Sequence, residues 1–160
     1  MDFRVGIGYD SHRFAPERPL VIGGIRIPFE QGLKAHSDGD VLIHAICDAL
    51  LGAAALKDIG THFPDNDARF KNADSAVLLS GVVTLLSERD WRVNNLDCVI
   101  VAEQPKMKPY IDRITERLAT LLQTDPANIS VKAKTNEQMG FTGAGEGIAA
   151  VAVTTIIKND

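Results

Sequence analysis

The sequence predicts an α+β fold in which helices pack on one face of a mixed β-sheet. Strand-like and helical segments follow one another as strand, helix, helix, strand, helix, strand, strand, and this order is not a strict alternation. The chain has 160 residues, of which 45% are hydrophobic and 24% are charged. This length and composition are typical of one globular domain, residues 1–160, that buries a full-sized core.

The N-terminal half of the chain predicts one strand, one hairpin and one helix. The run RVGIG (4–8) is a strand pattern, and PLVIGGIRIPF (19–29), with its central pair of glycines, reads as a hairpin. A helix is predicted over 38–56, with Ser37 as the N-cap and Asp40 completing an acidic variant of the capping box.

The C-terminal half predicts two helices and three strands. A helix is expected over 74–89, followed by a strand rich in β-branched residues over 92–103. The segment 109–122 has the apolar spacing of an amphipathic helix. ISVKAKT (129–135) and GIAAVAVTTIIK (147–158) close the chain as strands.

Composition and charge argue against several classes of protein. The formal net charge is −4 without a basic stripe, which disfavours a nucleic-acid partner or a membrane surface. No apolar run reaches the roughly 18 residues of a membrane span, and the chain does not start like a secretory signal. Cys47 and Cys98 lie in apolar contexts, so free buried thiols in a reducing compartment are favoured over a disulfide.

Three of the four histidines lie in two short segments that are also rich in aspartate. Asp10 and His12 follow the first strand, and His44 lies on the predicted helix between Asp40 and Asp48, one turn away on either side. A polar helix stripe is usually a solvated face, but such a face normally mixes lysine, glutamate, glutamine and arginine. Asp10, His12 and His44 make a set that zinc takes at catalytic sites. Asp40 or Asp48 could accept the other ring N–H of His44.

Two further loops carry polar and glycine residues. LKDIGTHFPDND (56–67) places three aspartates among turn residues, and it fits a functional loop and a plain turn equally well. VKAKTNEQMGFTGAGEGIA (131–149) places Glu137 before a glycine-rich turn, whose backbone N–H groups can bind phosphate. This turn matches neither the Walker nor the dinucleotide-binding motif, so by itself it assigns no ligand.

Four motifs, in their order and spacing, resemble the 2-C-methyl-D-erythritol 2,4-cyclodiphosphate synthase family. They are GYDSHRF (8–14), HSDGDVLIHAICDALLGAAALKDIGTHFPD (36–65), AEQPKM (102–107) and NEQMGFTGAGEGIA (136–149). The resemblance extends from residue 3 to about residue 157, and the ungapped block from Ser37 to Ala53 is its most specific part.

The resemblance implies an enzyme, a phosphorus–oxygen lyase of the non-mevalonate isoprenoid route. It would convert 4-diphosphocytidyl-2-C-methyl-D-erythritol 2-phosphate into 2-C-methyl-D-erythritol 2,4-cyclodiphosphate and CMP. It would assemble as a homotrimer with active sites between neighbouring subunits. The implied cofactors are zinc, or another divalent transition metal, and magnesium or manganese. A bacterial cytoplasmic location fits the sequence, and so does a processed plastid protein.

The resemblance also implies residue roles. The zinc ligands would be Asp10, His12 and His44, supported by Asp40 and Asp48, and Glu137 would bind the second metal. The transition state would be stabilised by His36 and Thr135. The group that holds the methylerythritol phosphate would comprise Ser37, Asp58, Ile59, Gly60, Phe63, Pro64, Asp65, Asn66 and Asp67. The group at the cytidine end, from the adjacent subunit, would comprise Ala102, Lys106, Met107, Ala133 and Lys134, and Phe141 would be a further substrate contact.

Two other classes of function remain open from the residues alone. A zinc-dependent phosphoester or diphosphate hydrolase would activate water, with Asp58 as its base. A non-catalytic trimeric ligand-binding protein would use a similar fold without chemistry. The chain also departs from the family at Ala144, where many members carry an arginine that lines a cavity on the trimer axis. Because alanine offers no donor to phosphate, we expect weak binding of geranyl or farnesyl diphosphate there.

Overall fold

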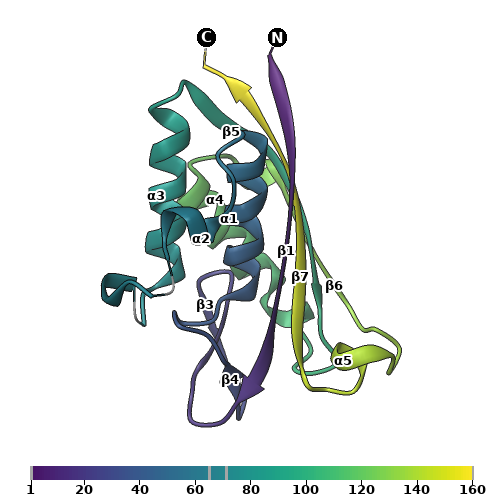
Figure 1. Cartoon of the computed structure of the whole chain (residues 1–160). Helices are drawn as coiled ribbons and strands as arrows, with labels where there is room; N and C mark the ends of the chain where they lie inside the picture. Colours follow the sequence, from purple (N-terminus) through teal and green to yellow (C-terminus); the bar gives the residue numbers. More distant parts are fainter. Residues whose placement is uncertain (1, 65, 71, 160) are drawn as a thin grey trace.

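The centre of the molecule is a five-stranded mixed sheet with the strand order β4-β1-β7-β5-β6 (Figure 1). Its strands are β1 (Phe3–Ala15), β4 (Gly32–Leu33), β5 (Trp91–Val101), β6 (Ile129–Lys134) and β7 (Gly147–Lys158). β7 runs antiparallel to both β1 and β5, and β6 runs parallel to β5. The predicted hairpin is present as β2 (Leu20–Ile22) and β3 (Ile25–Ile27). This computed structural model describes residues 2–64, 66–70 and 72–159.

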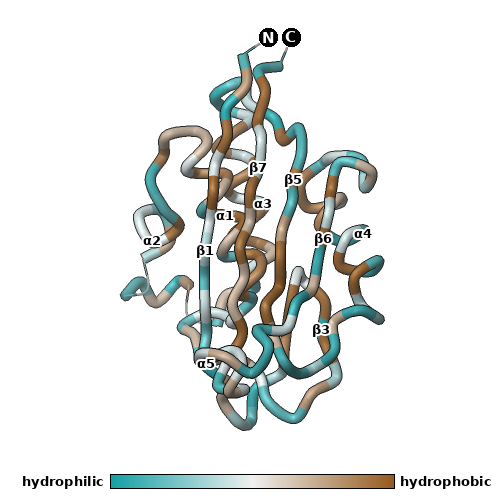
Figure 2. The backbone as a smooth tube through the Cα atoms, turned by 90° about the vertical axis from the view of Figure 1, so that its right-hand side faces the viewer, coloured by the Kyte–Doolittle hydropathy of each residue, from teal (hydrophilic) through white to brown (hydrophobic). Residues whose placement is uncertain are grey.

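The three long helices cover one face of this sheet. They are α1 (Val41–Ala53), α3 (Ser75–Ser87) and α4 (Ile111–Leu122), while α2 (Ile59–His62) and α5 (Gly140–Gly143) are single turns. Three 3-10 turns lie at Ala68–Phe70, Lys108–Tyr110 and Pro126–Asn128. Figure 2 looks onto the strands, with α1 and α3 behind them. The predicted α+β fold with helices on one face is therefore confirmed. Within the described chain, no helix is long and apolar enough to cross a membrane.

α1 lies between the sheet and α3, so it is buried on nearly every side. Its stripe of Asp40 and His44 is not a solvated face, in line with its unusual composition, because Asp40 is fully buried and the side chain of His44 is only 13% exposed. Both cysteines are buried and free, as predicted from their apolar contexts. Cys47 belongs to α1 and Cys98 to β5.

β1 and α1 approach closely because two positions of β1 lack a side chain. A Cβ on Gly6 would lie 1.9 Å from the carbonyl oxygen of Ala49, and one on Gly8 would lie 1.9 Å from that of Ala45. Because successive residues of a strand point to opposite faces, residues 10 and 12 share the α1 side with these glycines. The close packing of strand on helix thus brings the polar end of β1 against α1.

The ends of several elements differ from the sequence prediction. α1 begins at Val41 with Asp40 as its N-cap, rather than earlier with Ser37 as the cap. The carboxylate of Asp40 accepts the Ile43 N–H, which satisfies one of the free donors of the first turn. β1 continues to Ala15, well beyond the predicted strand. The glycine-rich turn contains the short helix α5 before β7 begins. Of the two residues that could cap α3 by sequence, Asp74 and Ser75, the structure has Asp74 as the N-cap.

Candidate active site

Asp10, His12 and His44 converge where the polar end of β1 meets α1. The carboxylate Oδ2 of Asp10 lies 2.9 Å from Nε2 of His12 and 3.1 Å from Nδ1 of His44. The two ring nitrogens are 3.1 Å apart, and one ligand atom from each residue lies within 4.8 Å of the others. One carboxylate oxygen and two imidazole nitrogens are donors that zinc takes at catalytic sites. The convergence predicted from the sequence is present, and the three residues form a candidate metal site.

The electrostatics of this cluster suit a cation. Burial raises the pKa of Asp10, but hydrogen bonds and charge from His12 and His44 outweigh burial and lower it to about 2. Burial also lowers the pKa of His44, but its hydrogen bond to Asp10 and that carboxylate's charge outweigh burial and raise it. The cluster therefore favours a bound proton when no metal is present. Because a metal must displace that proton, its affinity is expected to fall as the pH falls.

A cavity of about 240 Å³ opens beside the three candidate ligands. Besides them, its lining contains the predicted residues His36, Ser37, Asp48, Ile59, Gly60 and Phe63. Nε2 of His36 is buried and, within the described residues, has no hydrogen-bond partner. Leaving a buried polar atom without a partner costs about 1–3 kcal/mol, so this nitrogen is suited to bind a ligand oxygen.

Asp48 and Asp40 take other partners than His44. Oδ1 of Asp48 accepts the Ile59 N–H at 2.8 Å, which holds the start of α2 against α1. The carboxylate of Asp40 accepts the N–H groups of Gly23 and Gly24 at 2.9 and 2.6 Å, besides that of Ile43. Asp40 therefore ties the β2–β3 turn to the start of α1. The prediction that these two carboxylates accept the ring N–H of His44 differs from the contacts observed.

The loop from α2 onwards forms one wall of the cavity. Asp58 is the N-cap of α2 and accepts the Thr61 N–H at 2.9 Å. Phe63 packs edge-on against Phe70, with 5.3 Å between the ring centroids. Asp67 pairs with Arg69 at 2.6 Å, which lowers the pKa of Asp67. Pro64, Asn66 and Asp67 are not among the cavity-lining residues, and Asp65 lies outside the described residues.

Thr135 and Glu137 lie on a turn that does not line this cavity. The hydroxyl of Thr135 donates to Oε1 of Glu137 at 2.6 Å. Glu137 and Gln138 both have positive φ angles, of 51° and 62°. The turn is held by Glu103, whose Oε1 accepts the N–H groups of Asn136 and Gln138 at 3.0 and 3.2 Å. Within one chain, Thr135 and Glu137 therefore do not reach the cavity that the metal cluster lines.

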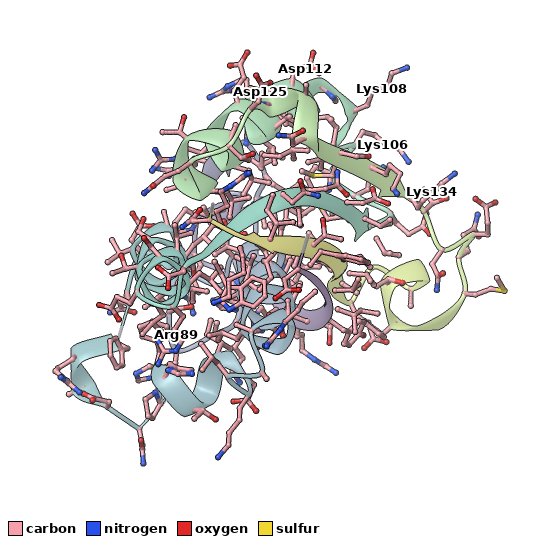
Figure 3. The ribbon with its side chains drawn as sticks, turned by 90° about the horizontal axis from the view of Figure 1, so that it is seen from above. Arg89, Lys106, Lys108, Asp112, Asp125 and Lys134 are labelled. Carbon is pink, nitrogen blue, oxygen red and sulfur yellow. The ribbon has the colours of Figure 1, made fainter. Side chains whose placement is uncertain are left out.

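The predicted cytidine-end residues lie around the ends of β5 and β6. The Ala102 N–H donates to the carbonyl oxygen of Lys134 at 2.9 Å, so the two segments are adjacent. Ala102 and Met107 are buried, whereas Ala133 and Lys134 are exposed. Figure 3 shows Lys106 and Lys134 on the same side of the molecule. Phe141 lies apart from them, in a shallow hollow that it shares with His12.

Sequence reasoning missed several residues of the site. Phe70 and Leu78 line the cavity, and no polar or spacing signal distinguishes them from core residues. Ser75 and Asp38 form hydrogen bonds around His44. Asp38 belongs to the same run of residues as Asp40, whereas Ser75 lies at the start of a separate helix and has no sequence signal that links it to His44.

The fold and the cavity together define a small α+β enzyme with a candidate metal site. The chain belongs to the YgbB family, whose model matches residues 3–157. A Synechococcus relative named 2-C-methyl-D-erythritol 2,4-cyclodiphosphate synthase is 56% identical over 155 residues, which cover 97% of this chain and 99% of the relative. One of the same name from Bacillus cytotoxicus is 55% identical over 156 residues, covering 98% and 99% respectively.

Solved structures agree with this assignment. The bifunctional IspDF of Campylobacter jejuni superposes with a TM-score of 0.96 at 41% identity, covering 99% of this chain and 43% of that one. The Plasmodium falciparum IspF complex with CDP has a TM-score of 0.87 at 34% identity, covering 99% and 97%. The activity implied by the resemblance is confirmed: it is that of a 2-C-methyl-D-erythritol 2,4-cyclodiphosphate synthase, a phosphorus–oxygen lyase of the non-mevalonate isoprenoid route.

Proposed function

We propose that Asp10, His12 and His44 hold zinc and that His36 binds a phosphate oxygen of the substrate as it reacts. The observation that carries this proposal is the cavity that joins the three candidate ligands to the partnerless Nε2 of His36. The carboxylates that line the cavity are those of Asp10 and Asp48, while the substrate, 4-diphosphocytidyl-2-C-methyl-D-erythritol 2-phosphate, is strongly anionic. Zinc at this cluster, with magnesium or manganese at Glu137, would neutralise this charge and polarise the reacting phosphate.

The reaction needs no protein base. The second pKa of a phosphate monoester is near 6, so the substrate's own 2-phosphate is already a charged nucleophile at pH 7. One of its oxygens forms a bond to the β-phosphorus of the diphosphate. The bond from that phosphorus to the bridging oxygen breaks, and CMP leaves with the electron pair. The protein mainly has to position the two phosphates and complement their charge.

The described residues suggest how positioning is achieved. Asp48 anchors α2, so that Ile59 and Gly60 form a fixed wall beside the metal cluster. Ser37 and Asp58 are proposed to hold the methylerythritol phosphate together with Phe63, Pro64, Asp65, Asn66 and Asp67. The cytidine end is proposed to bind Ala102, Lys106, Met107, Ala133 and Lys134, with Phe141 as a further contact. The CDP complex of the Plasmodium falciparum relative supports a cytidine nucleotide as part of the substrate.

The separation of the two halves within one chain supports a homotrimer with sites between subunits. Thr135, which is proposed to act on the transition state, and Glu137 would face the metal cluster of a neighbouring copy. The outer face of β1 supports the same assembly, because Phe3, Val5 and Ile7 are 64%, 58% and 70% exposed there. Large apolar side chains gathered on one face of a soluble protein mark an interaction surface.

Product analysis in ¹⁸O-labelled water tests the reaction. We expect the cyclic diphosphate and CMP in equal amounts, with no solvent oxygen in either product. A linear, labelled phosphate product would instead show a hydrolase. Zinc analysis of the purified chain tests the metal centre, and a chain without zinc affinity would overturn it.

Two variants of matched exposure test the trimer. Ile7→Glu places a charge on the outer face of β1, and Val77→Glu does the same at an equally exposed position of α3. Light scattering should show dissociation of the first variant alone. Mixing inactive His44→Ala and Glu137→Ala chains should restore part of the activity, since some interfaces then combine two intact halves. Absence of any recovery would contradict sites shared between subunits.

We also propose a single domain and a bacterial cytoplasmic location. One hydrophobic cluster joins the sheet and the three long helices, which supports a single domain over residues 1–160. Bacterial relatives support the bacterial cytoplasm as the location.

A further inference from the structure

His44 presents its two ring nitrogens to different surroundings. Nδ1 faces the carboxylate of Asp10 and the ring of His12, which are the other candidate metal ligands. Nε2 points the other way and lies 2.9 Å from Oγ of Ser75 and 3.1 Å from Oγ of Ser37. A metal bound by this cluster therefore takes the lone pair of Nδ1. The ring proton must then reside on Nε2, where it needs an acceptor.

Ser75 is a suitable acceptor because its own proton is committed elsewhere. Its hydroxyl donates to Oδ1 of Asp38 in a short hydrogen bond. Asp38 also accepts the Ser75 N–H at 3.0 Å and the Asp40 N–H at 3.1 Å, so its carboxylate serves only as an acceptor. Because its O–H is directed at Asp38, the oxygen of Ser75 can turn its lone pairs toward Nε2 of His44. Ser75 is fully buried, so water does not compete for this contact.

The surroundings of Ser37 do not determine whether its hydroxyl donates or accepts. Its oxygen accepts the Gly39 N–H at a longer distance, 3.3 Å, and no carboxylate accepts its proton among the described residues. Ser37 can therefore either donate to or accept from a neighbouring group. Its position on the cavity wall is compatible with a bound substrate. Of the two hydroxyls beside Nε2 of His44, only that of Ser75 has a carboxylate acceptor for its proton among the described residues, so it is the one that must accept from Nε2–H.

We propose that Ser75 and Asp38 form a relay that holds His44 as an Nδ1 ligand of the metal. In this relay Nε2–H of His44 donates to Ser75, and Ser75 donates to Asp38. Metal-binding histidines commonly give their second N–H to a carboxylate, and here a serine is inserted between the two. Ser75 and Asp38 are thus positioning residues, which act through His44. The proposal rests on the metal centre proposed above.

The loss of Ser75's hydroxyl tests the relay against a matched control. Removing an outer hydrogen-bond partner of a metal ligand typically lowers metal affinity by about 10–100-fold. We expect a loss of this size for Ser75→Ala, measured by competition for zinc with a chelator at pH 7. Ser80→Ala is the control, because Ser80 lies on the same helix and its hydroxyl bonds only the carbonyl of Ala76. It should bind zinc as tightly as the unaltered chain.

A second measurement uses the unaltered chain and so does not depend on a variant that folds. Nitrogen NMR of the zinc-loaded, ¹⁵N-histidine-labelled protein should show His44 coordinated through Nδ1, with a slowly exchanging proton on Nε2. Coordination through Nε2 would overturn the relay, as would zinc affinity of Ser75→Ala equal to that of the control. If the unaltered chain binds no zinc at all, the proposed metal centre fails and the relay fails with it. Normal zinc binding with an unaffected Ser75→Ala overturns the relay alone.

Discussion

Gly8→Ala should open the contact between β1 and α1 and thereby pull the candidate metal ligands apart. The added Cβ would lie 1.9 Å from the carbonyl oxygen of Ala45 and 2.7 Å from the backbone N of Ala49. Contacts of Cβ atoms below 3.0 Å are essentially absent from proteins, so the gap must widen by at least about 1.1 Å. Both atoms belong to the helix backbone, which cannot turn aside as a side chain can.

This displacement has two measurable consequences. Overpacking of a core typically costs about 1–3 kcal/mol, and we expect Gly8→Ala to lose at least that much unfolding free energy in urea. His44 moves with α1, whereas Asp10 and His12 stay on β1, so the three candidate ligand atoms move apart. A misplacement of about 1 Å can cost roughly 100-fold in rate. We therefore expect weaker zinc binding and a turnover number reduced by about that factor.

Gly52→Ala is the matched control for this prediction. It lies on α1, and outside its own helix the nearest described neighbour of an added Cβ would be the carbonyl oxygen of Ile7 at 3.9 Å, an ordinary contact. Alanine is favoured over glycine inside a helix by about 0.5–1 kcal/mol, so this variant should be as stable as the unaltered chain or more so. If Gly8→Ala matched Gly52→Ala in stability and zinc affinity, the close approach of β1 and α1 would not position the ligands.

Four further predictions concern single side chains. His44→Ala should remove most bound zinc and most activity while the chain stays folded, and near-stoichiometric zinc by elemental analysis would contradict its role as a ligand. Asp48→Ala removes the acceptor of the Ile59 N–H and so loosens the α2 wall of the cavity, which should raise KM with little change in zinc affinity. A loss of zinc affinity in this variant would instead support the role of Asp48 beside the metal ligands that the sequence predicted. Burial raises the pKa of Asp40 to about 6 from 3.8, so the folded state holds that proton more tightly than the unfolded state. The unaltered chain should therefore gain stability relative to Asp40→Asn as the pH falls from 7 to 4, by up to roughly 3 kcal/mol, and a pH-independent difference in urea unfolding would refute this. Ala144→Arg should bind farnesyl diphosphate more tightly than the unaltered chain in calorimetric titration, and equal affinity would show that Ala144 does not limit binding.

The sequence by itself determined the features that depend on residues close together in the chain. Apolar periodicity located the three long helices and the strands that flank them, because each element repeats its own pattern every two or 3.6 residues. The short spacing of Asp10 and His12 singled them out as candidate ligands, but only the structure showed that β1 continues through them and places both on one face. The family motifs then identified the activity, because they extend over nearly the whole chain.

Only the tertiary structure decided which partner each polar side chain takes. Asp40 and His44 are one helical turn apart, yet Asp40 bonds the glycine turn of the β2–β3 hairpin, 17 residues away at Gly23. His44 instead meets Ser75, 31 residues further along the chain. Helical spacing predicts neighbours on one surface, but buried polar groups bond whichever donor or acceptor packing brings within reach. The distant partners of His44 and Asp40 follow from the packing of α1 between the sheet, the hairpin and α3, which no local pattern contains.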